Sequence, residues 1–244
     1  MPDFTQRTEL LIGKDAMERL SAARIILFGV GGVGSWCAES LIRSGVCHLT
    51  LVDCDAVSPS NLNRQLVATT ETVGERKVLA MRKRLLSINP EADIVAIDKR
   101  VSVESLPEFD LDSYDYVLDA IDALKDKAFL IRAACNSRAT LFSSMGAGLK
   151  IDASRIRTSE FWSIRFDPIA RMLRKRFRQE KNLPSKPFLC VWSDEMLENA
   201  GPQPPDDDDN PVRKAWVNGT LPHITAIFGF TLAGLVIQDL VIEK

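Results

Sequence analysis

Short apolar runs alternate with segments of helical spacing along the first 150 residues of the chain. The apolar runs predict buried strands over residues 24–28, 48–52, 94–97, 116–118 and 140–143. The segments between them predict helices over residues 33–44, 75–87 and 124–138, with a shorter helix at 14–21. Strands and helices that alternate in this way are typical of a mostly parallel sheet covered on both faces. The predicted fold class is therefore α/β, with a doubly wound, Rossmann-like sheet.

The pattern becomes less regular after about residue 150. We therefore divide the chain into a sheet domain at 1–150 and a C-terminal region at 151–244. That region contains a basic helix, a proline-rich loop with four aspartates at 206–209, and an apolar stretch from Ile224 to Ile237. The stretch is shorter than the roughly 20 apolar residues of a membrane-spanning helix. It predicts a buried core or subunit-interface helix, and we expect no membrane partner.

The composition is that of an ordinary globular protein, with 45% hydrophobic and 26% charged residues. A net charge of -2 excludes a chain coated with positive charge, so any contact with nucleic acid must come from a local patch. Residues 1–7 lack the basic region and apolar run of a secretory signal, which favours a cytoplasmic location. Five cysteines without a CxxC pair indicate reduced thiols: Cys37, Cys47, Cys54, Cys135 and Cys190.

A glycine-rich loop joins the first predicted strand to the helix after it. Gly29, Gly31 and Gly34 match the G-x-G-x-x-G pattern, Gly32 lies within it, and Asp53 ends the next strand. Glycines let the backbone turn tightly and approach phosphates, while a carboxylate in the place of Asp53 can bond a ribose hydroxyl. The loop favours a nucleotide or dinucleotide site. A tight turn without a ligand is the alternative.

Charged residues follow the second strand and indicate which nucleotide binds. Arg64 and Lys77 could neutralise a triphosphate, which carries more negative charge than a dinucleotide pyrophosphate, and carboxylates could hold its metal ion. Asp119 and Asp122 follow another strand, at the edge where open α/β sheets bind ligands, so one of them could hold Mg²⁺. A solvated surface for the two cations and a helix cap for the two aspartates remain the alternatives.

Several motifs together, in one order, resemble the ubiquitin-activating-enzyme-like superfamily of the ThiF and MoeB type over roughly residues 5–150. They are G-x-G-G-x-G, L-x-D-x-D, S-N-L-x-R-Q, the position of Lys77, and L-D-x-x-D. The resemblance implies that ATP and Mg²⁺ are bound, that Asp122 holds the metal near the reacting centre, and that Arg7 reaches the nucleotide of a homodimer partner. The implied catalytic residues are Asp122, Arg64, Lys77 and Arg7. The implied nucleotide-binding residues are Gly29, Gly31, Gly32, Gly34, Asp53, Asp55, Asn61, Gln65 and Asp119.

The last third of the chain indicates which subfamily of this superfamily the sequence resembles. Several relatives carry two CxxC pairs for zinc, whereas this chain has none, so we expect no structural zinc. Residues 167–176 and 225–230 resemble bacterial tRNA threonylcarbamoyladenosine dehydratases, which use ATP to close a threonylcarbamoyl side chain of tRNA into a ring. Adenylation gives the carboxylate a leaving group, and the neighbouring carbamoyl group then attacks with a large proximity advantage.

Three alternatives stay open. One is an adenylyltransferase that activates the C-terminus of a ubiquitin-like sulfur-carrier protein, and a sulfur-transfer protein is a conceivable partner in either case. The second is an NAD-linked oxidoreductase, and the third is a silent scaffold that keeps the fold for dimerisation. Cys190 lies near the position of a nucleophilic cysteine in related enzymes, but no basic neighbour is evident in sequence, so we interpret it as a buried structural thiol.

The basic helix supports an RNA substrate. Between residues 165 and 181, seven basic residues stand against two acidic ones. A basic stripe at helical spacing could follow the phosphates of tRNA, although a solvated amphipathic helix paired with the aspartates at 206–209 would show the same pattern. The predicted apolar face holds Ile169, Met172, Leu173 and Phe177, and the predicted basic face holds Arg171, Arg174, Lys175 and Arg178.

Overall fold

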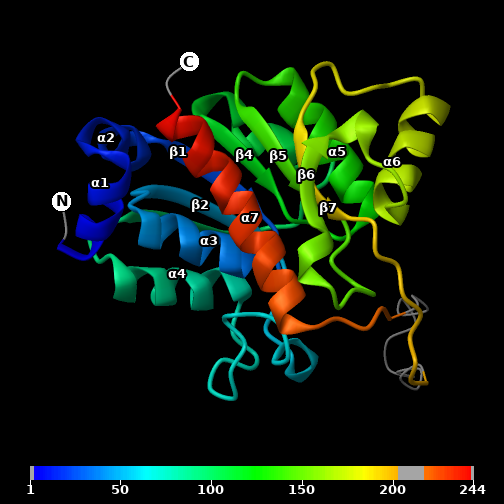
Figure 1. Cartoon of the computed structure of the whole chain (residues 1–244), viewed down its shortest axis with the longest axis horizontal. Coiled ribbons are helices and arrows are strands. Elements are labelled where there is room, and N and C mark those ends of the chain that lie inside the picture. The colour runs from blue at the N-terminus through cyan, green and yellow to red at the C-terminus, as the bar shows by residue number, and fades with distance from the viewer. Residues whose placement is uncertain (1–2, 203–216, 243–244) are drawn as a thin grey trace.

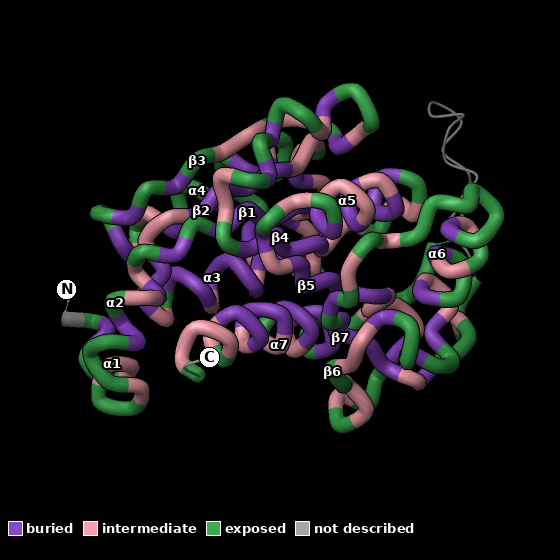
Figure 2. The backbone as a smooth tube through the Cα atoms, turned by 90° about the horizontal axis from the view of Figure 1, so that it is seen from above, coloured by how far each residue is buried: buried purple, intermediate pink, exposed green. Residues whose placement is uncertain are grey.

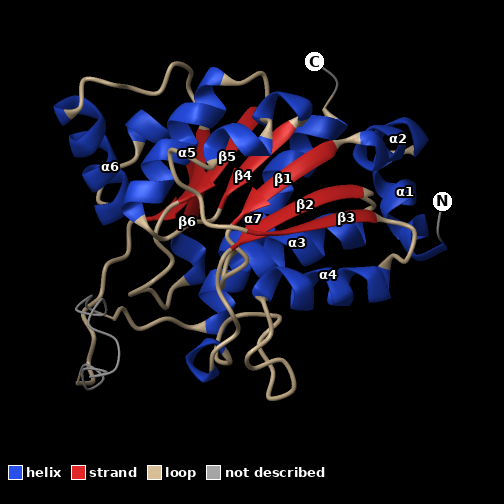
Figure 3. Cartoon of the chain, turned by 180° about the vertical axis from the view of Figure 1, so that it is seen from behind, coloured by secondary structure: helices blue, strands red, loops and turns tan. Residues whose placement is uncertain are grey.

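A twisted sheet crosses the whole molecule in the computed structural model, which describes residues 3–202 and 217–242. Within these residues its seven strands are β1 (Arg24–Phe28), β2 (His48–Asp53), β3 (Asp93–Asp98), β4 (Tyr116–Asp119), β5 (Thr140–Ser144), β6 (Ile156–Glu160) and β7 (Leu189–Ser193). Their order is β3-β2-β1-β4-β5-β7-β6, and all neighbours are parallel except β6 and β7. The predicted fold class, a doubly wound and mostly parallel sheet, is confirmed (Figure 3).

Helices cover both faces of this sheet. They are α1 (Gln6–Ile12), α2 (Lys14–Ala22), α3 (Gly34–Ser44), α4 (Lys77–Ile88), α5 (Leu124–Asn136), α6 (Pro168–Gln179) and α7 (Pro222–Val241). Short 3-10 helices, η1 to η6, cover Asp3–Thr5, Pro59–Asn61, Leu106–Phe109, Leu111–Ser113, Ala153–Arg155 and Phe161–Ser163. The helices α3, α4 and α7 lie on one face, and α5 lies on the other (Figures 1 and 3).

Alternating side chains of β1 pack into the two apolar cores, one on each face of the sheet. Ile25 and Leu27 belong to the core under α3 and α7, whereas Ile26 and Phe28 belong to the core under α5 and α6. All four side chains are fully buried, because successive residues of a strand point to opposite faces and both faces are covered. This is why the strand appears in the sequence as an unbroken apolar run.

The sheet continues beyond residue 150. β7 pairs with β5 in parallel, and β6 pairs with β7 in the antiparallel sense, so the C-terminal region adds two strands that its irregular pattern did not predict. All five predicted strands and the four predicted helices of the first 150 residues are confirmed, with ends that differ by a few residues at most. The helix α1 was not predicted. The aspartates at 206–209 lie outside the described residues.

The C-terminal helix α7 crosses α3 closely (Figure 1). A Cβ atom at Gly229 would clash with the Val33 carbonyl oxygen, so a glycine is needed at this crossing. The helix has 20 residues and is long and apolar enough to span a membrane, so our argument from length was wrong. Half of its most apolar window is buried within the chain, and Phe228 and Leu232 are fully buried. Figure 2 shows this buried face toward α3.

Candidate functional site

A cleft of about 810 Å³ opens at the carboxyl ends of β1, β2 and β4. Because β1 lies between β2 and β4 and their crossovers lie on opposite faces, this is the switch point at which open α/β sheets bind ligands. Nine of the predicted site residues line this cleft: Gly29, Gly31, Gly32, Asp53, Asp55, Arg64, Gln65, Lys77 and Asp122.

The glycine loop brings the start of α3 to the floor of the cleft. Gly29 has a φ of 91°, and a Cβ atom there would lie 2.7 Å from the Ala120 carbonyl oxygen. A Cβ atom at Gly34 would clash with the Gly29 carbonyl oxygen, so Gly34 serves the packing of loop on helix and does not itself line the cleft. No side chain caps the N-terminus of α3. Its first amides and its dipole therefore favour an anion at this end.

Asp53 fixes the loop against the end of β2. One carboxylate oxygen accepts a hydrogen bond from the Val30 amide at 2.7 Å, and the other accepts from the Asp55 amide at 2.8 Å. Burial raises the pKa of Asp53, while the nearby charge of Lys77 lowers it in part. Each oxygen keeps a second lone pair, so the carboxylate can still accept a hydrogen bond from a ribose hydroxyl.

Lys77 places a buried positive charge in the wall of the cleft. Its side chain is only 7% exposed, and its ammonium lies 2.7 Å from the Asp55 carboxylate, which is 63% exposed. A buried ammonium needs a partner, and Asp55 supplies it from the solvent side. Arg64 also lines the cleft and donates to the Ser60 carbonyl and to the Asn63 side chain, at 2.9 and 3.0 Å.

Gln65 offers an unsatisfied polar atom to the cleft. The residue is 6% exposed, and its Oε1 atom has no hydrogen-bond partner among the described residues. Buried polar atoms of this kind are rare because each costs the free energy of a lost hydrogen bond. Its side chain approaches Gly31 of the glycine loop. The residues present therefore fit a polar ligand that lies along the loop, as a nucleotide would.

Besides Gly34, two predicted nucleotide-binding residues do not line the cleft, Asp119 and Asn61. Asp119 is fully buried, forms a 2.8 Å ion pair with Lys127, and accepts hydrogen bonds from Ser143 and from the Ile121 amide. Asn61 is buried in η2 and accepts from the Ser58 amide at 3.1 Å, so it shapes the loop that carries Arg64. Both were predicted as ligand contacts because the motifs place them beside residues that do face the cleft.

Asp122 and Arg7 lie in different places. Asp122 is exposed at the mouth of the cleft. Arg7 is exposed on α1 and does not line the cleft of its own chain. The described residues contain no group of three metal-ligating side chains. This arrangement still fits Mg²⁺, which takes one or two carboxylates together with phosphate oxygens and water.

A second lobe of the cleft was missed in the sequence. It is lined by residues 144–148 at and after the end of β5, most of them small, by the segment before α7, and by Ile169 at the start of α6. The run Ser144-Met145-Gly146-Ala147-Gly148 follows a predicted strand, and its position at the carboxyl edge of the sheet is the signal that could have identified it. We call the part of the cleft beside the glycine loop its charged lobe. We call the part lined by residues 144–148, by Ile169 and by the segment before α7 its lobe of small side chains.

The basic helix is confirmed as α6, with two corrections to its faces. Met172 is 43% exposed and lies outside the core, whereas Leu173 and Phe177 are fully buried. Arg174 is half-buried, because its guanidinium donates to the Phe161 carbonyl at 3.2 Å and lies over the Phe161 ring. The exposed basic side chains of the predicted stripe are therefore Arg171, Lys175 and Arg178.

Cys190 lies within β7 and is completely buried, and burial raises the pKa of its thiol well above the ordinary value. A thiol in this state is a poor nucleophile. The structural interpretation of Cys190 therefore agrees with its surroundings.

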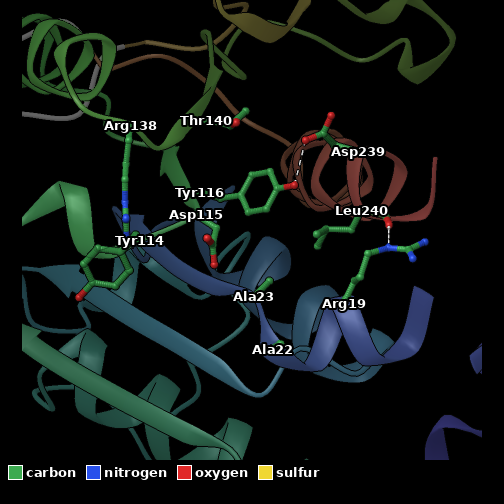
Figure 4. Close-up of a pocket in the computed structure, with 10 residues that line it drawn as sticks. All are labelled: Arg19, Ala22, Ala23, Tyr114, Asp115, Tyr116, Arg138, Thr140, Asp239 and Leu240. Atoms are coloured by element: carbon green, nitrogen blue, oxygen red, sulfur yellow. Dashed lines mark hydrogen bonds between the residues drawn. The ribbon is translucent and has the colours of Figure 1, made fainter. Parts of the chain in front are cut away.

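A groove of about 610 Å³ lies at the other end of the strands (Figure 4). Polar groups that line the groove bond to one another. The Tyr116 hydroxyl donates to Asp239 at 2.8 Å, and Arg19 donates to the Leu240 carbonyl at 2.7 Å. These bonds attach the end of α7 to β4 and α2. The groove lies at the amino ends of β4 and β5, far from the glycine loop, so it is not the nucleotide site.

Comparison with known proteins finds relatives along nearly the whole chain. The family model described as the ThiF family matches residues 5–241. The tRNA threonylcarbamoyladenosine dehydratase of Bacillus subtilis is 35% identical over 96% of this chain and 93% of that protein. The protein of the same name from Haemophilus influenzae is 34% identical over 94% of this chain and 90% of that protein. The crystal structure of Escherichia coli tRNA N6-threonylcarbamoyladenosine dehydratase in complex with ATP matches with a TM-score of 0.85 and 31% identity, over 97% of this chain and 93% of that one.

Proposed function

Because the chain belongs to the ThiF family, we propose that it is an ATP-dependent dehydratase that activates the carboxylate of threonylcarbamoyladenosine in tRNA and closes it into a ring. The observation that carries this proposal is the two-lobed cleft, in a chain similar over nearly its whole length to a dehydratase solved with ATP. One lobe has the charges for a triphosphate. The other has room for the small side chain of the modified nucleoside.

ATP would lie with its phosphates along the glycine loop and the start of α3. Lys77 and Arg64 would supply positive charge for the phosphates, and the unsatisfied Gln65 Oε1 would accept a hydrogen bond from a hydroxyl or amino group of the nucleotide. Asp53 would accept from the ribose hydroxyls. Asp122 would hold Mg²⁺, which neutralises the phosphate oxygens and the charge that develops as the leaving group departs.

The chemistry requires activation because a free carboxylate is a poor electrophile. Arg64, Lys77 and the first amides of α3 would orient ATP so that the substrate carboxylate attacks the α-phosphate and displaces pyrophosphate, which leaves AMP on the carboxylate as the leaving group. The neighbouring carbamoyl group then attacks the activated carbonyl within the same side chain, and the ring closes as the leaving group departs. Proximity within one side chain supplies much of the rate. The enzyme needs no thiol for this step, in keeping with the burial of Cys190.

The chain would act as a homodimer. Leu10 and Leu11 of α1 are 82% and 84% exposed, and Arg7 on the same helix is exposed as well. Adjacent exposed leucines beside a cation fit a surface that a second copy covers, from which Arg7 would reach the partner's nucleotide. The tRNA would contact the exposed side chains of α6, at the opposite end of the molecule from α1 (Figures 1 and 2). We place this reaction in the cytoplasm.

The test measures release of AMP from ATP with three acceptors: tRNA that carries threonylcarbamoyladenosine, the same tRNA without the modification, and a ubiquitin-like sulfur-carrier protein. We expect release with the modified tRNA alone, and loss of release in Asp122→Ala. Release with the carrier protein and not with tRNA would favour the adenylyltransferase instead. Binding of NAD without binding of ATP would overturn the whole proposal.

A further inference from the structure

Phe166 is a large apolar side chain held in an unusual position. It is 78% exposed, immediately before Asp167, the residue that caps α6. Its φ of 69° lies in the left-handed region, which bulky L-residues rarely adopt. Its ring belongs to neither apolar core and to none of the ring pairs found among the described residues. Backbone strain that is kept at an exposed aromatic side chain indicates a function for that side chain.

The neighbours of Phe166 hold the ring outward. Ile164 is 1% exposed on one side, and Asp167 is 1% exposed on the other, where its carboxylate accepts from the Ala170 amide at 2.8 Å. The segment is thus fixed at both ends. The backbone of Phe166 is therefore held between two buried residues, and its ring is exposed.

The chain on either side of Phe166 carries exposed basic and aromatic side chains. Trp162 is 37% exposed, and the Arg178 guanidinium lies 5.7 Å from its ring centre. Arg165 and Arg171 are exposed as well. Of the acidic groups nearby, Glu180 pairs with Arg132 and Arg176, and Glu160 accepts a hydrogen bond from the Trp162 amide through one carboxylate oxygen. The local charge therefore favours a polyanion.

This surface adjoins the mouth of the cleft. Ile169, three residues after Phe166, lines the lobe of small side chains, and a Cβ atom at Gly146 would lie 3.2 Å from it. Three residues of extended chain span at most about 10 Å. The Cα atom of Phe166 therefore lies within about 10 Å of that of Ile169, a residue that lines the cleft.

We propose that Phe166 and Trp162 form a stacking platform for an unpaired nucleobase beside the nucleotide whose side chain enters the cleft. The proposal rests on the proposed function and adds the mode of recognition. Proteins read RNA loops by stacking unpaired bases on aromatic rings, while basic side chains follow the phosphates. Stacking tolerates different bases, so the platform fixes the position of the loop and leaves base identity open.

The experiment measures binding of an anticodon stem-loop RNA by fluorescence anisotropy over a salt series, for the full chain and its variants. Phe166→Leu keeps an apolar side chain without a ring, and we expect about tenfold weaker binding with an unchanged salt dependence. Phe166→Trp keeps a ring and should bind like the parent. The paired change Arg171→Gln with Lys175→Gln should flatten the salt dependence, whereas Lys83→Gln on α4, exposed far from this surface, should not.

Phe166→Gly distinguishes a role of Phe166 in RNA binding from a role in stabilising the fold. Glycine adopts a positive φ without strain, so we expect a higher melting temperature together with weaker RNA binding. Parent-like RNA binding by the Leu variant overturns the platform, as does equal loss in the Leu and Trp variants. A lower oligomer mass in the Leu variant would assign this surface to a second copy of the chain. If the parent chain binds no RNA, both the platform and the proposed function fail. If the Phe166→Leu variant binds RNA like the parent and still closes the ring, the platform fails and the proposed function stands.

Discussion

The buried pair of Asp119 and Lys127 holds the backbone that carries Asp122. Both side chains are 0% exposed, and the ammonium lies 2.8 Å from the carboxylate. The carboxylate accepts from the Ile121 amide at 3.1 Å, and the ammonium donates to the Ile121 carbonyl at 3.0 Å. The pair therefore fixes both backbone groups of the residue that precedes Asp122.

Lys127→Met removes the charge and leaves a side chain of similar length. Asp119 then keeps only the Ser143 hydroxyl and the Ile121 amide, in a fully buried place. Breaking one partner of a buried pair costs about 3–5 kcal/mol of the free energy of unfolding. For a chain of this size that corresponds to a fall in melting temperature on the order of 10 °C. We also expect kcat to fall with little change in the KM for ATP, because Asp122 moves while the glycine loop does not.

Denaturant unfolding of four chains checks this reasoning: the parent, Lys127→Met, Asp119→Leu and the double variant. We expect the double variant to lose clearly less than the sum of the single losses, because neither charge is left unpaired. Lys125→Met is the matched control, since Lys125 is exposed on the same helix, and it should change stability by no more than about 0.5 kcal/mol. Losses that simply add would refute the coupling, and an unchanged kcat would refute the positioning of Asp122.

Three further predictions follow from single contacts. Gly34→Ala should abolish ATP binding in calorimetry and lower the melting temperature, because the new methyl group meets the Gly29 carbonyl oxygen; normal ATP affinity would contradict the role of this packing. Burial alone would raise the pKa of Glu39, but hydrogen bonds from Arg84 and Arg43 hold it below the ordinary value. Its stabilisation is therefore complete above about pH 4.3, the ordinary value, and is lost as the pH falls through the lowered pKa. Glu39→Gln should reduce stability at neutral pH, with a difference from the parent that narrows in acid, whereas Glu18→Gln, at an exposed site, should change little. Arg7→Ala and Asp122→Ala should each be inactive alone, and mixing the two chains should restore activity if Arg7 serves the partner's site; no recovery in a mixture shown to exchange subunits would contradict this.

The sequence predicts the sheet well because its central strands are buried on both faces and appear as unbroken apolar runs. It predicts the edge poorly. β6 reads Ile-Arg-Thr-Ser-Glu, with little apolar character, and only its pairing with β7 makes it a strand. β7 itself is an apolar run, Leu-Cys-Val-Trp-Ser, whose place beside β5 depends on contacts distant in the chain.

The candidate site shows the same limit at the level of single residues. Asp119 and Asp122 occupy the two acidic positions of one motif, and the sequence treats them alike. Asp119 is buried and Asp122 is exposed because Lys127 pairs with Asp119 alone. The position of a lysine in a helical pattern favours exposure to solvent, but Lys127 is buried against Asp119. Arg174 differs from its basic neighbours in the same way, because the Phe161 carbonyl and ring give it a partner toward the interior. Side-chain partners that arrive from other elements cannot be predicted from local spacing.

The central claim is that this cleft uses ATP to remove water from threonylcarbamoyladenosine in tRNA. The most direct measurement incubates modified tRNA with ATP, Mg²⁺ and the purified chain, digests the RNA to nucleosides, and weighs the modified nucleoside by mass spectrometry. We predict that the nucleoside loses the mass of one water molecule, that AMP forms in equal amount, and that Asp122→Ala gives neither product. A nucleoside of unchanged mass, under conditions in which the chain binds both ATP and the tRNA, would contradict the claim.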